Sequence, residues 1–416
     1  MVFSQFDRMI LRNLALEVAD IAALPEMARR RRLWVEHNSL RSRYPMMLVF
    51  PEGSWAELLP EASLQCVAPD AREVEENLRR RIYGWKHFCD DTVVEREWVA
   101  AKRISNTGWG LAPRRIPSPV TRGSFHIDPV IKAPADLKKL RMPEVVYDEK
   151  GSQAYLDAVR DLFGDILEVK PRGMRRVDFH MLNHYTALRG LEEFMMDMYA
   201  EPQMLHEALA FMTEGNLRLM KQYADMNLLS LNNDSTYHGS GGNGYTDHLP
   251  APGADPSRVR YADVWGFSES QEMAQVSPEH HVEFALQYEK KLLAPFGLNS
   301  YGCCEDLTRK LDDVLAVPNM RRISISPWAD VDVCAAKLKG RAVYSWKPNP
   351  AHLVGDFNAA RVRDYVRHAV QAAKTHGCFL EMVLKDTHTC EQRPERFDEW
   401  TRVARGVITE EAGAAG

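Results

Sequence analysis

The chain has 416 residues, of which 45% are hydrophobic and 27% are charged, and its formal net charge is −5. This is the balance of a globular protein large enough to bury a core without disulfides. The acidic balance argues against a nucleic-acid or anionic-membrane surface, so we expect neither as a partner. Seven scattered cysteines, and no apolar run of about 18 residues, favour a cytoplasmic protein without a membrane span.

The pattern of elements changes after the first forty residues. These predict two helices, the second beginning near Pro25. Short β-rich runs then alternate with long amphipathic stretches. The runs that predict strands are 46–50, 93–104, 166–169, 228–231, 297–301, 322–326, 342–346 and 379–384. The main stretches that predict helices are 70–90, 151–163, 188–200, 203–225 and 278–294, and residues 108–132 predict a hairpin excursion.

Strands that alternate with helices imply right-handed crossovers and a parallel sheet. Eight such units in an α/β chain favour a (β/α)8 TIM-like barrel with N-terminal helices and a hairpin or loop insertion. The expected division is a helical extension over 1–44, the barrel over 45–405 and a frayed tail over 406–416. An open doubly wound sheet is the rival, but no Gly-x-Gly-x-x-Gly motif follows an early strand.

In a barrel of this kind the residues after each strand converge on one face, where the chemistry gathers. The side chains expected there are Glu52, Asn232, Asp234, His238, Cys303, Glu305, Trp328, Lys347, Asp386, His388 and Cys390. This set combines thiols at two strand ends with carboxylates and histidines. Polar loops alone account for part of it, but less readily for the thiols.

The thiols and imidazoles in this set are natural zinc ligands. We expect Cys303 and Cys390 to bind a zinc ion, with Glu305 and His388 (or His238) as further ligands. Adjacent cysteines diverge in an extended segment, so Cys304 is left out of the set. The alternative is that these cysteines are small buried hydrophobic residues.

Three carboxylates, Glu52, Asp234 and Asp386, are the expected acid/base groups, because carboxylates in a cleft are often tuned for proton transfer. The side chains expected to bind a small-molecule substrate are Asn232, His238, Trp328 and Lys347. The glycine-rich segment 239–244 lacks the Lys-Ser/Thr of a phosphate loop, and we expect a lid or a backbone-contact loop there.

An ordered series of motifs runs through most of the chain. Its segments are Leu-Arg-Gly-Leu-Glu-Glu at 188–193 with Pro202, Ser-Pro-Glu at 277–279, Tyr-Gly-Cys at 301–303 and Lys-Pro-Asn-Pro at 347–350. Between about residues 45 and 400 this series resembles the uroporphyrinogen decarboxylase superfamily. It is more similar to the cobalamin-dependent methyltransferase-like branch than to the true decarboxylase.

The resemblance implies an activity and its cofactors. In those methyltransferases, zinc held by His, Cys and a distant Cys assists transfer of a methyl group between a small methylated substrate and a corrinoid. By this resemblance the chain would act on, for example, a methoxylated compound, with a cobalamin-binding protein as partner. Cys303 stands at the middle ligand position and Cys390 at the distant one, whereas Tyr301 replaces the histidine.

Two alternatives remain. Where the true decarboxylase carries Arg-Gln-Ala-Gly-Arg after its first strand, this chain has Pro51-Glu52-Gly53-Ser54-Trp55, and Glu52 would repel a polycarboxylate. A metal-free decarboxylase or lyase acting on another acid stays open. So does a ligand-binding relative without catalysis, because Tyr301 replaces the family histidine. A homodimer is also open.

Overall fold

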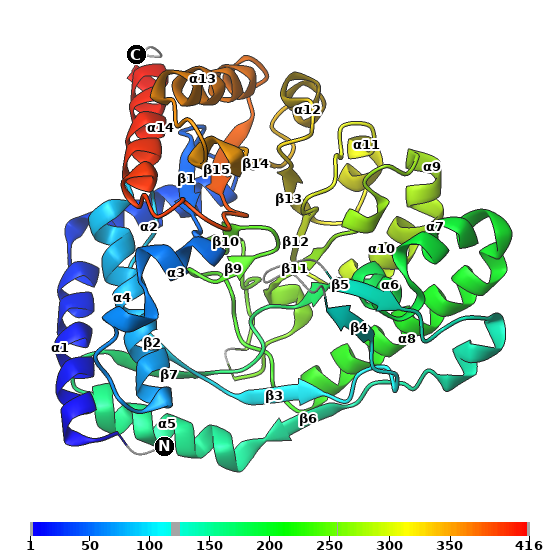
Figure 1. The fold of residues 1–416 in the computed structure, drawn as a ribbon, viewed down its shortest axis with the longest axis horizontal. Helices are drawn as coiled ribbons and strands as arrows, with labels where there is room; N and C mark the ends of the chain where they lie inside the picture. The colour runs from blue at the N-terminus through cyan, green and yellow to red at the C-terminus, as the bar shows by residue number, and fades with distance from the viewer. Residues whose placement is uncertain (1–2, 118–124, 256, 414–416) are drawn as a thin grey trace.

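The computed structural model describes residues 3–117, 125–255 and 257–413 and is built around a seven-stranded parallel sheet (Figure 1). In spatial order its strands are β8 (Asp178–Phe179), β11 (Trp265–Ser268), β12 (Leu298–Tyr301), β13 (Met320–Ile325), β14 (Val343–Trp346), β15 (Phe379–Leu384) and β1 (Met46–Val49). Among the described residues, nothing pairs β8 with β1. The fold is therefore an α/β fold of TIM-like character whose barrel is not closed.

Eight further strands form four separate pairs. They are the parallel pair β2 (Glu97–Ala101) with β7 (Glu168–Arg172), and the antiparallel pairs β3 (Arg103–Asn106) with β6 (Val145–Asp148), β4 (Arg114–Pro117) with β5 (Phe125–Asp128), and β9 (Tyr237–His238) with β10 (Gly242–Asn243). The β4–β5 pair is the hairpin excursion expected within 108–132, of which residues 118–124 lie outside the described part.

Helices cover the sheet and its flanks (Figure 1). They are α1 (Gln5–Ala22), α2 (Pro25–Asn38), α3 (Trp55–Leu58), α4 (Pro69–His87), α5 (Glu149–Phe163), α6 (Met181–Arg189), α7 (Leu191–Ala200), α8 (Pro202–Asp225), α9 (Pro278–His281), α10 (Gln287–Leu293), α11 (Leu311–Leu315), α12 (Val331–Leu338), α13 (Ala359–Thr375) and α14 (Glu395–Gly413). A π-helical stretch, Val282–Leu286, joins α9 to α10. Across the three described stretches, no helix has the length and apolarity needed to cross a membrane.

Most expected helices and strands are confirmed, and the errors concern strands between residues 93 and 268. The run 93–104 splits into β2 and β3, and 228–231 contributes only one bridge, between Leu229 and Met174. The sheet instead takes β8 and β11, which were not expected as strands. Strand β8 is two residues long, and β11 is buried at every position, so neither shows an alternating pattern. The tail expected from 406 is helical as far as Gly413.

The side chains of β1 show how the sheet joins two layers of the core. Met47 and Val49 pack in the main cluster with α10–α14, while Met46 and Leu48 pack in a second cluster with α1, α2, α4 and α5. Successive residues of a strand point to opposite faces, so one short strand anchors both clusters. The N-terminal helices are thus part of the packed body.

The glycine-rich segment packs inside the fold, so the expectation of a lid is wrong. Residues 238–246 are buried. A Cβ on Gly242 would lie 2.3 Å from Cζ of Arg322 on β13, and a Cβ on Gly241 would lie 2.5 Å from a methyl of Val383 on β15. Gly241 also has φ +114°, a conformation that favours glycine. The glycines therefore allow the backbone of this segment to approach the strands closely. This agrees with the other expectation for the segment, a backbone-contact loop.

A buried ion pair links the strands beneath this segment. Nε of Arg322 lies 2.9 Å from Oε1 of Glu381 on β15, and both side chains are almost fully buried. Nη2 of Arg322 also donates to Oδ1 of Asn38 at 2.7 Å and to the carbonyl of Asn243 at 2.8 Å. The pair therefore connects two strands with the end of α2 and with β10.

Replacing Glu381 with alanine leaves the guanidinium of Arg322 buried without its counter-charge. Breaking a buried pair on one side costs about 3–5 kcal/mol, and we expect a loss of this size in the free energy of unfolding. The measurement is urea unfolding followed by circular dichroism. Glu410→Ala, which breaks the exposed pairs to Arg363 and Arg367, is the matched control and should have little effect. Equal losses in the two variants would contradict the central role of the buried pair.

Candidate active site

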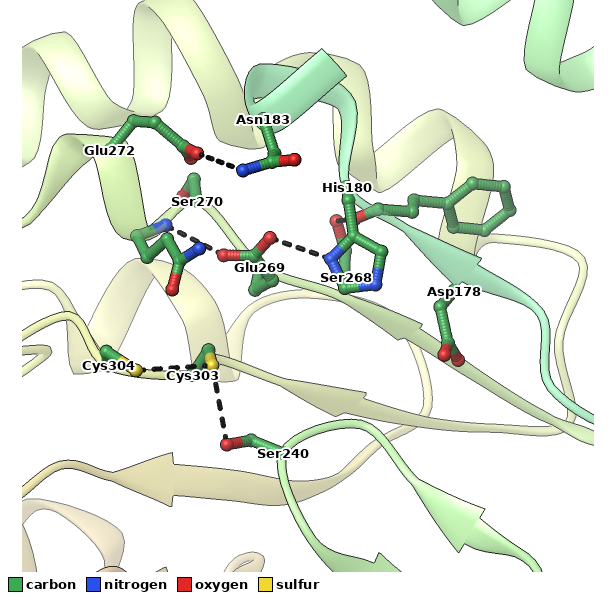
Figure 2. Close-up of polar contacts among 12 residues, drawn as sticks. Asp178, His180, Asn183, Ser240, Ser268, Glu269, Ser270, Glu272, Cys303 and Cys304 are labelled. Carbon is green, nitrogen blue, oxygen red and sulfur yellow. Dashed lines mark hydrogen bonds and ion pairs between the residues drawn. The ribbon is translucent and has the colours of Figure 1, made fainter. Parts of the chain in front are cut away.

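The carboxyl ends of the parallel strands meet at one edge of the sheet, where β8 and β11 place an acid/base pair. Ser268 pairs in register with Phe179, so the next residues, Glu269 and His180, are neighbours. Nδ1 of His180 lies 2.8 Å from Oε1 of Glu269 (Figure 2). Glu269 is buried, and its other oxygen accepts from the backbone N–H of Gln271 at 2.9 Å. The carboxylate therefore fixes the orientation of the imidazole.

The pair favours the charged form of His180. Burial alone would lower the pKa of His180, but the hydrogen bond to Glu269 and the charge of that carboxylate outweigh it, so the pKa is raised above 6.5. Figure 2 shows the second ring nitrogen on the side away from Glu269. A protonated His180 therefore carries one proton held by Glu269 and a second that it can donate.

Two adjacent thiols follow β12 at the same edge. The sulfur atoms of Cys303 and Cys304 are 3.5 Å apart, and Oγ of Ser240 lies 3.5 Å from the sulfur of Cys303 (Figure 2). The hydrogen bond between the thiols lowers the pKa of Cys304 and raises that of Cys303. Cys304, the exposed member, is the one that ionises first. Contrary to expectation, the two side chains do not diverge, because residues 303–305 form a bend and not an extended strand.

Glu305 and Tyr301 lie beneath these thiols as buried hydrogen-bonding groups. Glu305 accepts from the backbone N–H groups of Cys303 at 2.8 Å and Ser270 at 3.3 Å, and burial raises its pKa to about 8. The hydroxyl of Tyr301 donates to Glu289 at 2.7 Å and lies 2.9 Å from Nε2 of His281. Tyr301 is therefore a buried structural residue and does not reach the surface of the site.

A cavity of about 440 Å³ opens beside His180. Its walls are mostly apolar or aromatic, and Asp178 and Arg176 among its polar residues form an ion pair of 2.7 Å with each other. The residues that line it include Trp109, Leu111, Met174, Phe179, His180, His184, Leu188, Met220 and Tyr223. The volume suits a small organic molecule, and the apolar walls suit an uncharged molecule about the size of one ring.

On the other side of the sheet edge, β15 and β1 place a second polar group. Nζ of Lys385 lies 2.6 Å from Asp386 and 4.0 Å from Glu52, and the N–H of Asp386 donates to Glu52 at 2.9 Å. Glu52 and Asp386 have φ of +48° and +58°, and such strain in non-glycine residues gathers at functional sites. Burial raises the pKa of Glu52. The expected pair Glu52 and Asp386 is therefore brought together.

Lys347 after β14 is also at this edge, but it is fully buried. Its Nζ donates to Oγ of Ser345 at 2.6 Å and to the carbonyl of Ser345 at 3.1 Å. Burial lowers its pKa to about 7. Lys347 thus supports the interior beneath the thiols and is not exposed to bind a substrate, contrary to expectation.

Three other expected residues serve the structure instead, and a fourth, Trp328, is exposed. Asn232 is buried and bonds the backbone of Arg175 and Trp265, and its carbonyl lies 2.9 Å from Nε2 of His238. Burial lowers the pKa of His238 to about 3. Trp328 is 71% exposed. Asp234 accepts from Thr236 and pairs with Arg175 at 3.4 Å, and it lines a different cavity. Asn232, Asp234 and His238 follow the run 228–231, which did not join the sheet. Trp328 follows β13, which did join it, but its side chain points outward.

The four expected zinc ligands do not form one site. In the part of the chain that the structure describes, no three His, Cys, Asp or Glu side chains lie together where they could hold a metal ion. The thiol of Cys390 is buried and donates to Glu57 at 3.1 Å, Glu305 is bonded to backbone N–H groups, and His388 is exposed. The donors are therefore engaged elsewhere, and this ligand set does not fit zinc.

Sequence reasoning missed His180 and Glu269, because the strands that carry them were not recognised. The available signals were weak. Glu269 follows the buried aromatic run Trp265–Ser268, and His180 immediately precedes a helix. A run that is buried on both sides is expected of a central parallel strand, and this could have identified β11.

Comparisons with known proteins give little further information. No family model matches the sequence, and no curated protein sequence matches it. Among solved structures, a methyltransferase from Methanosarcina mazei is similar over 65% of this chain and 73% of its own, with 11% identity and a TM-score of 0.38. A similarity this low carries no argument about activity. The resemblance to the uroporphyrinogen decarboxylase superfamily stays a prediction.

Glu269→Gln should lower the pKa of His180, because it removes the charge that outweighs burial. The pKa of His180 is raised in the folded state, so its share of stability is present below pH 6.5 and is lost as the pH rises through the folded value. Glu269→Gln should therefore remove a stabilisation seen only on the acid side. NMR titration of the His180 ring tests the pKa directly. Asp332→Asn, which removes the carboxylate 3.0 Å from the exposed His368, is the control. An unchanged pKa in Glu269→Gln would refute the assignment.

Cys303→Ala should slow alkylation of Cys304 several-fold near neutral pH. The variant removes the thiol donor that stabilises the Cys304 thiolate, and the thiolate is the reactive form. Mass spectrometry of peptides after timed treatment with iodoacetamide gives the rate. Exposed Cys89 in the same sample serves as an internal reference. Unchanged or faster labelling of Cys304 would show that the thiols do not share a proton.

Proposed function

We propose that this chain is a methyltransferase or demethylase that moves a methyl group between a small methylated substrate and a cobalamin-binding partner protein. The observation that carries the proposal is the hydrogen-bonded pair of His180 and Glu269. His180 lines the 440 Å³ cavity, and its pKa is raised. The motif series of the sequence supports the same reaction class. Zinc has no part in the proposal, because the expected ligands do not fit it.

The substrate lies in the cavity beside His180, with its methylated heteroatom toward the imidazole. When bound over the mouth of the site, the corrinoid of the partner would supply a cobalt nucleophile to accept the methyl group. The bond between the methyl carbon and the heteroatom breaks, and His180 donates its outer proton to the heteroatom as it leaves. Glu269 keeps the imidazole charged until that moment. The leaving heteroatom therefore departs as a neutral group.

The walls of the cavity favour a neutral aromatic substrate, such as a methoxylated ring. Trp109, Tyr223 and Phe179 line the cavity with aromatic side chains, and the charges of Arg176 and Asp178 balance each other. A charged substrate would find no free counter-ion at this ion pair. Lys385, with Glu52 and Asp386, lies at the open edge, where a partner protein would dock over the mouth.

The test is methyl transfer to free cob(I)alamin, reduced chemically under anaerobic conditions, from a panel of methoxylated aromatic compounds. Loss of cob(I)alamin absorbance and release of the demethylated compound are the readouts. We expect transfer by the unmodified protein and a loss of about 10²–10⁴-fold in His180→Gln, the range for removal of a general acid. The rate should also fall as the pH rises through the raised pKa of His180, and Glu269→Gln should move this fall to lower pH.

His368→Gln is the matched control, because His368 forms a comparable pair with Asp332, 3.0 Å apart, on the surface. It should leave the rate unchanged. Full activity in His180→Gln would overturn the proposed role of this residue. Turnover that requires no cobalamin and releases CO2 would overturn methyl transfer in favour of the decarboxylase alternative.

A further inference from the structure

A second cavity, of about 580 Å³, lies between α2, the β2–β7 pair and the segment after Leu231. It is lined by six cationic side chains and four carboxylates. The cations are Arg31, Arg81, Arg96, Lys170, Arg172 and Arg175, and the carboxylates are Glu95, Glu97, Glu168 and Asp234. Neither His180 nor the thiols line it, so it is separate from the candidate active site.

The carboxylates are shared unevenly among these cations. Glu97 lies 3.0 Å from both Arg172 and Lys170, and Glu95 lies 2.6 Å from Arg31. Arg175 makes only a loose pair of 3.4 Å with Asp234. The cavity therefore has a local excess of positive charge.

Arg81 and Arg96 carry this excess. Within the residues that the structure describes, neither forms an ion pair with a carboxylate. Arg81 donates to the carbonyl of Glu97 and to Oδ1 of Asn77, both at 3.0 Å, and lies 5.4 Å from the ring centre of Trp98. Burial lowers the pKa of Arg81 to about 10. The charges of Glu97 and Glu95 offset only part of this burial, because neither carboxylate forms a direct ion pair with Arg81, and a bound anion would supply that partner.

We infer that this cavity is a binding site for a small organic oxyanion with two or more negative charges. Guanidinium groups bind phosphate and carboxylate oxygens through paired N–H donors. In this cavity Arg81 and Arg175 would bind the anion in this way. The same chemistry is found in phosphate esters and in polycarboxylates. The volume exceeds that of inorganic phosphate, so an organic molecule of sugar-phosphate or tricarboxylate size fits best.

The test is calorimetric binding to the full chain at constant ionic strength, with inorganic phosphate, glucose 6-phosphate, succinate and citrate as probes. We expect binding of at least one multivalent probe, and the phosphate and carboxylate arms identify the source of the oxyanion. Arg81→Gln and Arg175→Gln should each weaken that binding about tenfold or more, since each removes charge-assisted hydrogen bonds to the anion. Arg81→Lys should give an intermediate loss, because it keeps the charge without the paired donors.

Arg80→Gln is the control, because Arg80 is the next residue on α4 and pairs outward with Glu76 at 2.5 Å. It should bind the probe as the unmodified chain does. Urea unfolding of each variant reports whether it is folded, and Arg175→Gln supplies an independent test where Arg81→Gln is not. Absence of binding by every probe, or equal affinity in Arg80→Gln and both site variants, would overturn the inference. Neither result depends on methyl transfer.

Discussion

The fold depends on a buried charge pair, Arg322 with Glu381, placed inside an open parallel sheet. A lone buried guanidinium would be strongly unfavourable, so the strands that carry the two groups must stay in register. Arg322 also holds Asn38 and the carbonyl of Asn243, which ties the N-terminal helices and the glycine segment to the same point. His37 lies 3.7 Å from Glu381 but stays neutral, because burial lowers its pKa to about 4. His37 therefore adds no charge to the pair at neutral pH.

The glycine segment links this interior to the site. Its backbone lies close to β13 at Gly242 and close to β15 at Gly241. Ser240, in the turn between β9 and β10, contacts the sulfur of Cys303. Side chains at these glycines would push the segment away from the sheet. The position of Ser240, and with it one wall of the thiol pair, is therefore set by the absence of Cβ atoms deeper in the fold. Stability and site geometry share one constraint.

The sequence predicted the parts whose signal is local. Strands such as 379–384 and helices such as 203–225 have strong apolar patterns, and the residues after β1, β12 and β15 were placed correctly at the sheet edge. The sequence predicted a closed barrel, and the open sheet could not be derived from it, because closure depends on whether β8 pairs with β1. The His180–Glu269 pair was missed for the same reason, since His180 follows a strand of two residues. Tertiary pairing overrode a pattern too short to read.

The protonation of three buried carboxylates determines how many charges the site presents to a substrate. Three carboxylates, Glu269, Glu289 and Glu305, lie buried near one another, and burial raises the pKa of Glu289 and Glu305 to about 8. Both are therefore held largely as neutral acids near neutral pH. Glu269 instead pairs with the imidazole of His180 at 2.8 Å. The result is a balanced ion pair, His180 with Glu269, beside an apolar cavity. An uncharged substrate in this cavity can accept a proton from His180 without bringing a further charge into the interior. This balance is the physical reason to expect a neutral methylated compound as the substrate.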